Sequence, residues 1–304
     1  MTEGGLGGIL HTMFDCHSHV QFEAFKEDWK PTIERALADG VSIINVGTQR
    51  DTSAKAVEVA HLYPAGVYAA IGLHPVHTTR SFHDEAELGG GPAAKAFTSR
   101  GEEFDYDFYL NLARDPKVVA LGECGLDYYR PDGDPAQYKE RQKEVFLRHV
   151  KIAEETRKAL MIHCRPSKGT DDAYEDLLTL LQSNSKTPPT AVLHFYVGSY
   201  AMTQKFLDAH SASSGQAGFN FEFGGVITFA RDYDEQIKMI PLDRLLTETD
   251  APYVSPEPYR GRRNEPVYVV EVVKKLAEIK GISYDDMAKI TDANARRIFK
   301  IPTH

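Results

Sequence analysis

Five short stretches of the chain each contain residue types that bind divalent metal ions, and each stretch includes an apolar run. The first is Phe14-Asp15-Cys16-His17-Ser18-His19, in which the two histidines are two residues apart. Because strand side chains alternate between faces, both imidazoles would lie on the same side of a strand. The other candidates are a glutamate, two histidines and an aspartate: Glu123, His163, His194 and Asp250. This set of nitrogen and oxygen donors suits Zn²⁺, Mn²⁺ or Fe²⁺, whereas Mg²⁺ usually prefers more oxygen.

Two of these candidates can do more than hold an ion. Glu123 has two carboxylate oxygens and can therefore bridge two cations that clamp the attacking and leaving oxygens of a reaction. Asp250 can contact one ion and also accept a proton from metal-bound water. Each has a structural alternative, a salt bridge from Glu123 to Arg130 and a turn cap by Asp250 before Pro252. We predict Glu123 and Asp250 as the catalytic residues.

The elements that must position these residues follow from the hydrophobic pattern. Eight apolar runs predict strands near 13–17, 42–47, 67–73, 118–122, 159–162, 190–193, 219–228 and 244–248. Helical patterns fill most of the intervals, around 31–39, 53–62, 136–157, 171–182, 199–209 and 232–239. This alternation predicts an α/β fold, a TIM-like (β/α)₈ barrel whose active site lies at the carboxyl ends of the strands. The ligands fall at strands one, four, five, six and eight, which is typical of binuclear, amidohydrolase-like metal hydrolases.

The rest of the chain is expected to extend or cover this barrel. Residues 1–12 are predicted to be a flexible N-terminal extension, and 13–304 a single barrel domain with an insertion near 77–104. We expect the insertion to be solvated and without a catalytic role, although it leaves the rim of strand three. Asn264 can cap a helix running to about Lys280, and Ser283 can cap a second one.

Composition limits the classes of function. The chain of 304 residues is 42% hydrophobic and 26% charged, as in ordinary globular proteins. Its net charge of −9 argues against charge-driven adhesion to nucleic acid but does not exclude a local site. We expect no membrane segment and a cytoplasmic location, because the N-terminus is a poor secretory signal. Three cysteines form no disulfide framework, and we expect reduced, buried thiols that turn away from the barrel axis: Cys16, Cys124 and Cys164.

Several ordered motifs resemble the TatD-type metal-dependent deoxyribonucleases, a family of TatD-related hydrolases. Besides the first stretch, they are Ile71-Gly72-Leu73-His74-Pro75, Gly122-Glu123-Cys124-Gly125-Leu126-Asp127-Tyr128-Tyr129, His163-Cys164-Arg165, Glu248-Thr249-Asp250-Ala251-Pro252-Tyr253 and Arg260-Gly261-Arg262-Arg263-Asn264-Glu265-Pro266. The similarity spans nearly everything from Met13 to Ile301. The run Phe195-Tyr196-Val197-Gly198-Ser199 departs from the family's usual Cys-Phe-Ser-Gly-like run, and the insertion lengthens the strand-three loop. We expect these two departures to bear on substrate choice and to leave the metal set unchanged.

The resemblance implies a barrel that binds one or two divalent ions (Zn, Mn, Mg or Fe) and cleaves DNA, single-stranded or at 3′ ends, as a 3′–5′ exonuclease. It implies that one ion is held by His17, His19, Glu123 and Asp250. It implies that the second ion is held by Glu123, His163 and His194. His74 and Arg165 match family positions near the substrate, and the planar guanidinium of Arg165 can bind two phosphate oxygens.

Other functions remain open at this point. The same centre could hydrolyse an amide or ester, such as an aminoacyl bond on tRNA, because activated water also attacks carbonyl carbon. A non-catalytic metal-binding scaffold is a further alternative. Aromatic and basic residues near the motifs could form a platform for bases and phosphates: Tyr128, Tyr129, Tyr253, Tyr259 and the run Arg260-Gly261-Arg262-Arg263.

Overall fold

A parallel sheet of eight strands, in which neighbours follow chain order, forms the centre of the molecule. The structure is a computed structural model that describes residues 13–85, 93, 95–130, 133–184, 189–211 and 218–302. The expected N-terminal extension, 1–12, lies outside the described residues. In sheet order the strands are β1 (Met13–Ser18), β2 (Val41–Val46), β3 (Val67–Ile71), β6 (Val118–Asp127), β7 (Ala159–Arg165), β8 (Ala191–Leu193), β9 (Asn220–Phe223) and β10 (Leu245–Thr247). The predicted α/β barrel is confirmed.

The barrel closes where β1 meets β10. The Thr247 hydroxyl donates to the Phe14 carbonyl at 2.9 Å, and beyond the end of β10 the backbone N–H of Asp250 donates to the His17 carbonyl at 2.9 Å. The N–H of His19 donates in turn to the Ala251 carbonyl at 2.7 Å. These bonds join the first and last strands at their carboxyl ends, next to three of the predicted ligands.

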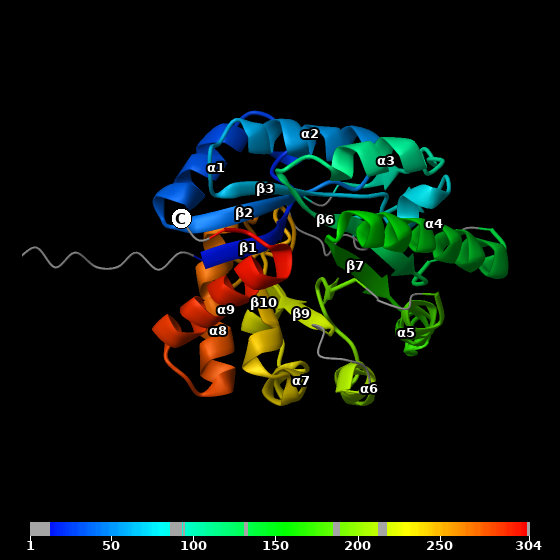
Figure 1. Ribbon diagram of the computed structural model, residues 1–304. Helices are drawn as coiled ribbons and strands as arrows, with labels where there is room; N and C mark the ends of the chain where they lie inside the picture. The colour runs from blue at the N-terminus through cyan, green and yellow to red at the C-terminus, as the bar shows by residue number, and fades with distance from the viewer. Residues whose placement is uncertain are drawn as a thin grey trace, which may run out of the picture.

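Helices surround the strands and also cover one end of the barrel (Figure 1). They are α1 (Trp29–Ala38), α2 (Arg50–His61), α3 (Tyr106–Ala113), α4 (Pro135–Thr156), α5 (Asp172–Asn184), α6 (Tyr200–Ser211), α7 (Asp234–Met239), α8 (Val269–Lys280) and α9 (Tyr284–Phe299). The Asp134 side chain caps α4, and Ser283 caps α9 as predicted. None of the described helices is long and apolar enough to cross a membrane.

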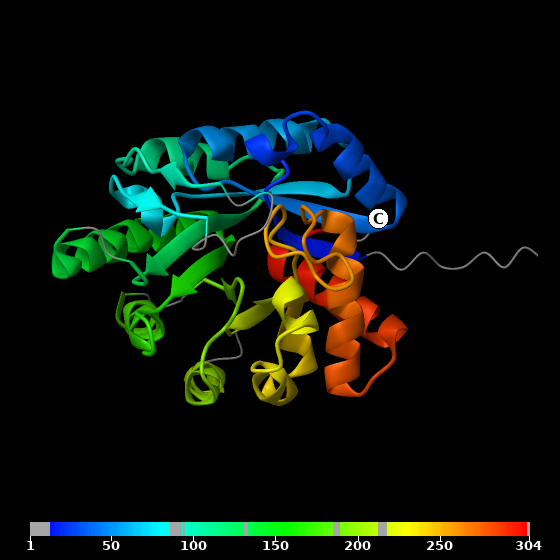
Figure 2. The same cartoon turned by 180° about the vertical axis from the view of Figure 1, so that it is seen from behind.

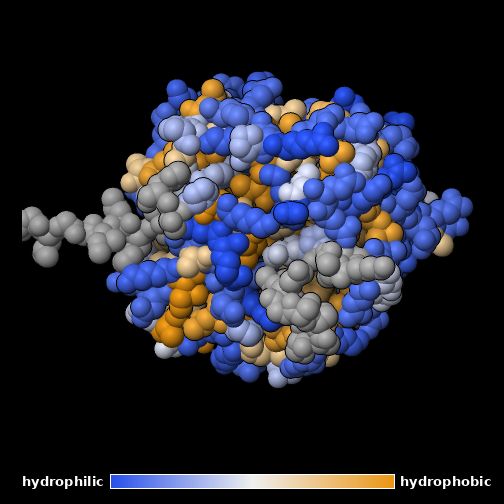
Figure 3. Space-filling view, in the orientation of Figure 1, coloured by the Kyte–Doolittle hydropathy of each residue, from blue (hydrophilic) through white to orange (hydrophobic). Residues whose placement is uncertain are grey.

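The two ends of the barrel differ. Helix α9 contacts β1 and β10 and lies on the near side in Figure 1, whereas the loops after β3 and β10 face the viewer in Figure 2. The face seen in Figure 3 is mainly hydrophilic, with smaller hydrophobic areas between the charged side chains. The carboxyl ends of the strands, and with them the predicted site, therefore lie on the side opposite α9.

The buried apolar residues form two clusters, one between the strands and the surrounding helices and one inside the barrel. The larger one joins strand residues to the surrounding helices and includes Cys124 and Cys164. The smaller one combines Phe14, Cys16 and residues of six further strands with the end of α9, so it fills the barrel interior. All three cysteines are buried free thiols. The outward orientation expected for Cys16 is wrong, because the register of β1 shifts between Asp15 and Ser18 and places Cys16 and His17 both inside.

Some element boundaries differ from those expected. Strand β6 continues past Gly122 to Asp127, and β9 ends at Phe223, where a short 3₁₀ helix follows. Helix α3 was not predicted. Helix α8 begins at Val269 rather than at Asn264, because the Asn264 side chain donates instead to the Thr249 and Tyr253 carbonyls.

The described part of the strand-three insertion packs on the protein. It forms an antiparallel pair, β4 (Phe82–His83) with β5 (Phe97–Thr98). His77 is buried and its Nδ1 lies 3.0 Å from the Ser99 hydroxyl, while the buried His83 stacks on Phe97. The expectation of a fully solvated insertion is therefore wrong for these residues.

Candidate metal centre

Strand β1 brings two imidazoles together at the carboxyl end of the barrel. The Nε2 atoms of His17 and His19 are 3.2 Å apart. The Nδ1 atom of His19 lies 2.7 Å from the Val46 carbonyl, which can only accept, so Nδ1 carries the proton. The Nε2 atom of His19 therefore faces His17, and it is the ring nitrogen of His19 that can bind an ion.

Asp250 approaches the same two histidines from beyond β10. Its Oδ1 atom is 3.4 Å from Nε2 of His19 and 4.0 Å from Nε2 of His17. Its backbone is left-handed, with a φ of 54°, a conformation that aspartate tolerates better than most residues. Buried Asp15 accepts from both the N–H and the hydroxyl of Thr249, which fixes the chain immediately before Asp250.

Glu123 lies between two groups of nitrogen atoms. Its Oε2 is 3.5 Å from Nε2 of His17 and 3.8 Å from Nε2 of His19. Its Oε1 is 3.1 Å from Nδ1 of His163 and 3.6 Å from Nε2 of His194. One carboxylate thus faces both groups, which is the geometry predicted for a bridging ligand.

A glycine allows this close approach of β6 to β7. A Cβ atom at Gly122 would lie only 2.2 Å from the Met161 carbonyl oxygen. Any larger residue would push apart the two strands that carry Glu123 and His163. The alternative of a salt bridge from Glu123 to Arg130 is not found, because Arg130 pairs with Asp84.

The donor atoms fit a divalent ion. Ligand distances of about 2.0–2.2 Å around a tetrahedral ion place neighbouring donor atoms about 3.4 Å apart. The measured separations among His17, His19, Glu123 and Asp250 lie between 3.2 and 4.0 Å. The six residues predicted as ligands are therefore brought together, and the four around His17 and His19 have separations close to this spacing.

Protonation within the cluster also suits metal binding. Burial lowers the pKa of His17 to about 3, so its ring is neutral. Burial alone would raise the pKa of Glu123, but the electrostatic effect of the adjacent His74 and hydrogen bonds from His163, His17 and His74 hold it well below its usual range. The pKa of Asp250 is likewise lowered, because the hydrogen bond from His19 and the nearby imidazoles outweigh burial.

His163 is favoured in its protonated form in this structure, which places a positive charge where the second metal ion is expected. Burial would lower its pKa, yet hydrogen bonds to Asp127 and Glu123 raise the pKa to about 9. The resulting imidazolium lies 3.1 Å from Oε1 of Glu123. A positive charge is thus already favoured at the position where the second group of ligands meets Glu123.

Three carboxyl side chains that the sequence analysis did not select support the cluster. Asp127 accepts from Nε2 of His163 at 2.8 Å, and Glu248 accepts from Nδ1 of His194 at 2.6 Å. Glu222 is fully buried close to Glu248, and neither of its oxygens has a hydrogen-bond partner among the described residues. Burial raises the pKa of Glu222 and Glu248 well above their usual range. The motifs quoted above contain Asp127 and Glu248, but no spacing rule separates a direct ligand from a supporting carboxylate.

The two residues predicted to bind substrate lie in different surroundings. Nε2 of His74 is 3.1 Å from Oε1 of Glu123, so His74 stands among the candidate ligands. Its Nδ1 accepts from the Val76 N–H. The guanidinium of Arg165 stacks on the Tyr129 ring at 3.9 Å, at the end of β7.

Most of the predicted platform is occupied by internal contacts. Tyr128 is buried and donates to Asp176, and Tyr259 stacks on Tyr268 with ring centroids 3.8 Å apart. Arg263 is held in a salt bridge to Asp28. Tyr253 is half-buried, and burial raises its pKa. These contacts engage Tyr128, Tyr259 and Arg263, whereas Tyr129 and Tyr253 are partly exposed and Arg260 is exposed.

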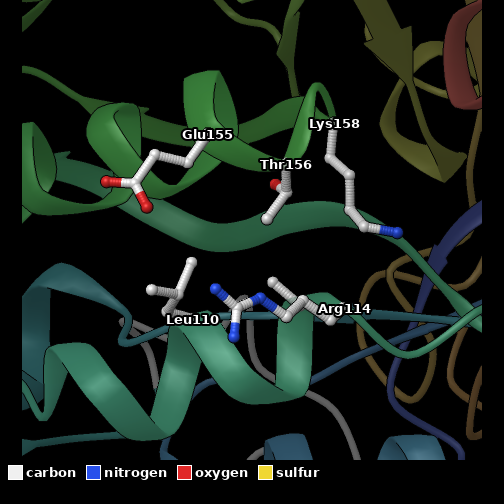
Figure 4. Close-up of a pocket in the computed structure, with 6 residues that line it drawn as sticks. Leu110, Arg114, Glu155, Thr156 and Lys158 are labelled. Carbon is white, nitrogen blue, oxygen red and sulfur yellow. The ribbon is translucent and has the colours of Figure 1, made fainter.

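A hollow of about 280 Å³ between α3 and α4 is separate from this centre (Figure 4). Arg114 and Leu110 line it from α3, and Glu155, Thr156 and Lys158 line it from the end of α4 and the turn after it. These residues precede β6 and β7 in the chain, so the hollow lies at the amino ends of the strands. The metal centre is at the other end.

Comparisons with known proteins agree with this centre. The family model described as "TatD related DNase" matches residues 14–300. This chain belongs to the TatD family. Among its TatD-family relatives, the uncharacterized metal-dependent hydrolase YabD of Bacillus subtilis is 36% identical over 292 residues, which cover 95% of this chain and 99% of YabD. The 3′-5′ ssDNA/RNA exonuclease TatD of Salmonella typhimurium is 31% identical over 297 residues, covering 95% and 99% of the two chains.

A solved TatD-family structure has the same architecture. The TatD homolog YjjV from Escherichia coli superimposes with a TM-score of 0.75 at 25% identity, covering 97% of this chain and 100% of YjjV. Family membership and the His, Glu and Asp cluster together establish a metal-dependent hydrolase.

Proposed function

We propose that this TatD-family hydrolase is a nuclease that removes nucleotides from the 3′ ends of single-stranded DNA. The single observation that carries the proposal is the position of Glu123 between two groups of donor atoms at the strand ends. The name of the Salmonella relative supports a nucleic-acid substrate. The family model's description supports DNA.

We assign two ion positions to the cluster. His17, His19, Asp250 and Oε2 of Glu123 would hold one ion, and Oε1 of Glu123 with His163 and His194 would hold the other. Bound divalent ions supply positive charge that activates water and stabilises oxygen atoms of the phosphodiester. The distance from Nε2 of His74 to Glu123 also makes His74 a candidate for the second position.

The protein's own groups orient the substrate and move the proton. Asp250 receives the proton of the attacking water, because its pKa is lowered and it is therefore an ionised acceptor at neutral pH. Glu123 fixes the separation of the two groups of ligands. Arg165 can bind two phosphate oxygens, since stacking on Tyr129 holds its guanidinium plane in place.

A metal-dependence assay with end-labelled DNA tests the proposal. Single-stranded DNA labelled at the 3′ or the 5′ end would be incubated with protein loaded with Zn²⁺, Mn²⁺ or Mg²⁺, beside a chelated sample. We expect immediate loss of a 3′-terminal label and a ladder from 5′-labelled strands, in the metal-loaded samples only. His163→Ala should abolish cleavage, and equal cleavage by this variant would identify contamination.

The same assay separates the proposal from other hydrolase functions. Aminoacyl-tRNA and simple esters would be tested in parallel. Cleavage of these substrates with intact DNA would reject the nuclease and favour an ester hydrolase. Asp250→Asn with full activity and bound metal would reject the proton-acceptor role.

A further inference from the structure

The exposed aromatic side chains among the described residues all follow strands of the barrel at their carboxyl ends. Four large hydrophobic residues are exposed among the described residues: Leu62, Phe82, Tyr200 and Phe229. Phe82 lies in β4 after β3, Tyr200 begins α6 after β8, and Phe229 follows the short 3₁₀ helix after β9, so all three follow the carboxyl ends of strands. Leu62 follows α2 and lies toward the opposite end of the barrel, where the strands begin. Exposed aromatic rings cost free energy in water, and their gathering at one rim indicates a ligand with flat apolar faces.

Phe229 forms a defined pair with Arg260. The Arg260 guanidinium lies 4.0 Å from the centroid of the Phe229 ring and covers one face, while 39% of Phe229 stays exposed. Arg260 donates through Nη1 to the Ser255 carbonyl, and no carboxylate among the described residues forms an ion pair with it. Its remaining N–H groups can therefore bind an anion beside an aromatic ring.

Two loops hold this pair in place. Gly225, in the loop after β9, lies so close to the loop after β10 that a Cβ atom there would be 2.3 Å from the Val254 carbonyl. The Glu257 N–H donates to the Thr228 hydroxyl at 2.9 Å, next to Phe229. The same loop begins at Gly224, against the Glu248 carboxylate that supports His194. The pair is therefore connected to the metal centre through a short, tightly packed segment.

Several basic side chains in the loops at this rim have no acidic partner among the described residues. Within the described ranges, five basic residues in the segments after β3, β7 and β10 form no ion pair: Arg80, Lys95, Lys168, Arg260 and Arg262. Cations beside exposed aromatic rings match a polyanion with unpaired bases, namely single-stranded nucleic acid.

We propose that Phe229 and Arg260 form a nucleotide-binding subsite of the TatD-family centre, with a base stacked on Phe229 and a backbone phosphate on Arg260. The inference rests on the proposed nuclease function. It adds residues that would bind the strand at nucleotides distant from the scissile bond. A duplex cannot use the subsite, because its bases are stacked on one another. The subsite therefore also accounts for a preference for unpaired strands.

The test compares a long substrate with one too small to reach the subsite. Phe229→Leu keeps an apolar side chain but removes the aromatic face, and Phe229→Trp restores one. Cleavage of a labelled twelve-residue oligothymidylate would be measured beside hydrolysis of bis(p-nitrophenyl) phosphate, using metal-loaded enzyme. We expect kcat/KM for the oligonucleotide to fall about tenfold in Phe229→Leu and to recover in Phe229→Trp, within the range for loss of one base stack. Hydrolysis of the small diester should stay within about twofold of wild type.

Arg260→Gln provides a second, independent measurement. Loss of one phosphate contact should lower the slope of log affinity against log salt by about 0.7 for a single strand. The controls are Leu62→Ala, which removes an exposed apolar side chain elsewhere, and Lys289→Gln, which removes an exposed charge on α9. Neither control should change oligonucleotide cleavage or its salt dependence.

The outcomes separate the subsite from the proposed function. If Phe229→Leu matches Leu62→Ala on the oligonucleotide, or lowers both substrates equally, the subsite is rejected while nuclease activity stands. Wild-type enzyme that hydrolyses the small diester but no oligonucleotide would reject the nuclease, and the subsite with it. An unchanged salt slope in Arg260→Gln would remove Arg260 from the phosphate contact.

Discussion

Asp127 determines which nitrogen His163 presents to the metal centre. It accepts from Nε2 of His163 and from the Tyr129 N–H, so its carboxylate is fixed in position. Burial would raise its pKa, but the hydrogen bond and charge of His163 lower it. The ionised Asp127 keeps the Nε2 proton of His163 in place and leaves Nδ1 facing Glu123.

Replacing this carboxylate should weaken one ion position and spare the other. In Asp127→Asn, we expect the affinity of the His163 position for metal to fall about 10–100-fold, because His163 loses its charged partner. The position formed by His17, His19 and Asp250 should keep its affinity, since none of the three contacts Asp127. Calorimetric titration of metal-free protein measures both. Asp176→Asn, which removes a carboxylate bonded to Tyr128, is the control. Unchanged binding in Asp127→Asn would contradict the supporting role.

At the scale of elements, the strands were the predictable part. Apolar runs of strand length between helical segments predicted all eight barrel strands. The barrel geometry then predicted that the ligands at the strand ends would lie close together. The extension of β6 through Gly122 to Asp127 was not predictable, because glycine and charged residues are uncommon in strands. The inward position of Cys16 depends on a register shift that alternation alone does not reveal. Burial of Glu222 needed three-dimensional information, since a polar residue inside a strand normally indicates a solvent-facing side.

Helix α4 is joined to the loop after β3 by a buried histidine. Nε2 of His149 accepts from the Leu73 N–H at 3.0 Å, and Nδ1 donates to the Val145 carbonyl. The ring must be neutral to accept this bond. Burial lowers the pKa of His149 to about 4. The unfolded chain, with a histidine pKa near 6.5, therefore binds a proton first as the pH falls.

This difference predicts acid sensitivity of the fold. The stability contributed by neutral His149 is present above about pH 6.5 and is lost as the pH falls towards 4. Between pH 7 and 5, wild type should lose about 2 kcal/mol more unfolding free energy than His149→Gln, whose amide oxygen can accept the same N–H without titrating. Urea denaturation of metal-free protein at both pH values measures this.

A second variant separates titration from the hydrogen bond. His149→Leu should be less stable than His149→Gln at both pH values by about 1–3 kcal/mol, because the Leu73 N–H is left buried without an acceptor. Its pH dependence should nevertheless match that of His149→Gln. Equal acid loss in wild type and His149→Gln would show that another group causes the sensitivity.

Across the whole molecule, the metal centre draws its ligands from strands distant in sequence. His17 and His19 come from β1, Glu123 from β6 and His163 from β7, while His194 and Asp250 follow β8 and β10. Only the closed barrel brings these residues within a few ångströms, and in the unfolded chain no such site exists. Four further hydrogen-bonded or packed carboxyl groups hold the arrangement: Asp15, Asp127, Glu222 and Glu248. Ion binding and closure between β1 and β10 are therefore coupled.

This coupling predicts that metal stabilises the entire barrel. An ion that binds only the folded state adds RT ln(1 + [L]/Kd), or about 2.7 kcal/mol at a hundredfold excess over Kd. We expect Zn²⁺ or Mn²⁺ to raise the unfolding free energy of wild type by about this amount, and EDTA to reverse the change. Glu123→Gln should lose most of the shift, because its neutral amide removes the charge shared by both positions. Glu144→Gln, an exposed substitution on α4, should keep the shift. Urea denaturation at fixed free metal measures each case, and an equal shift in Glu123→Gln would show that the ions stabilise the protein from elsewhere.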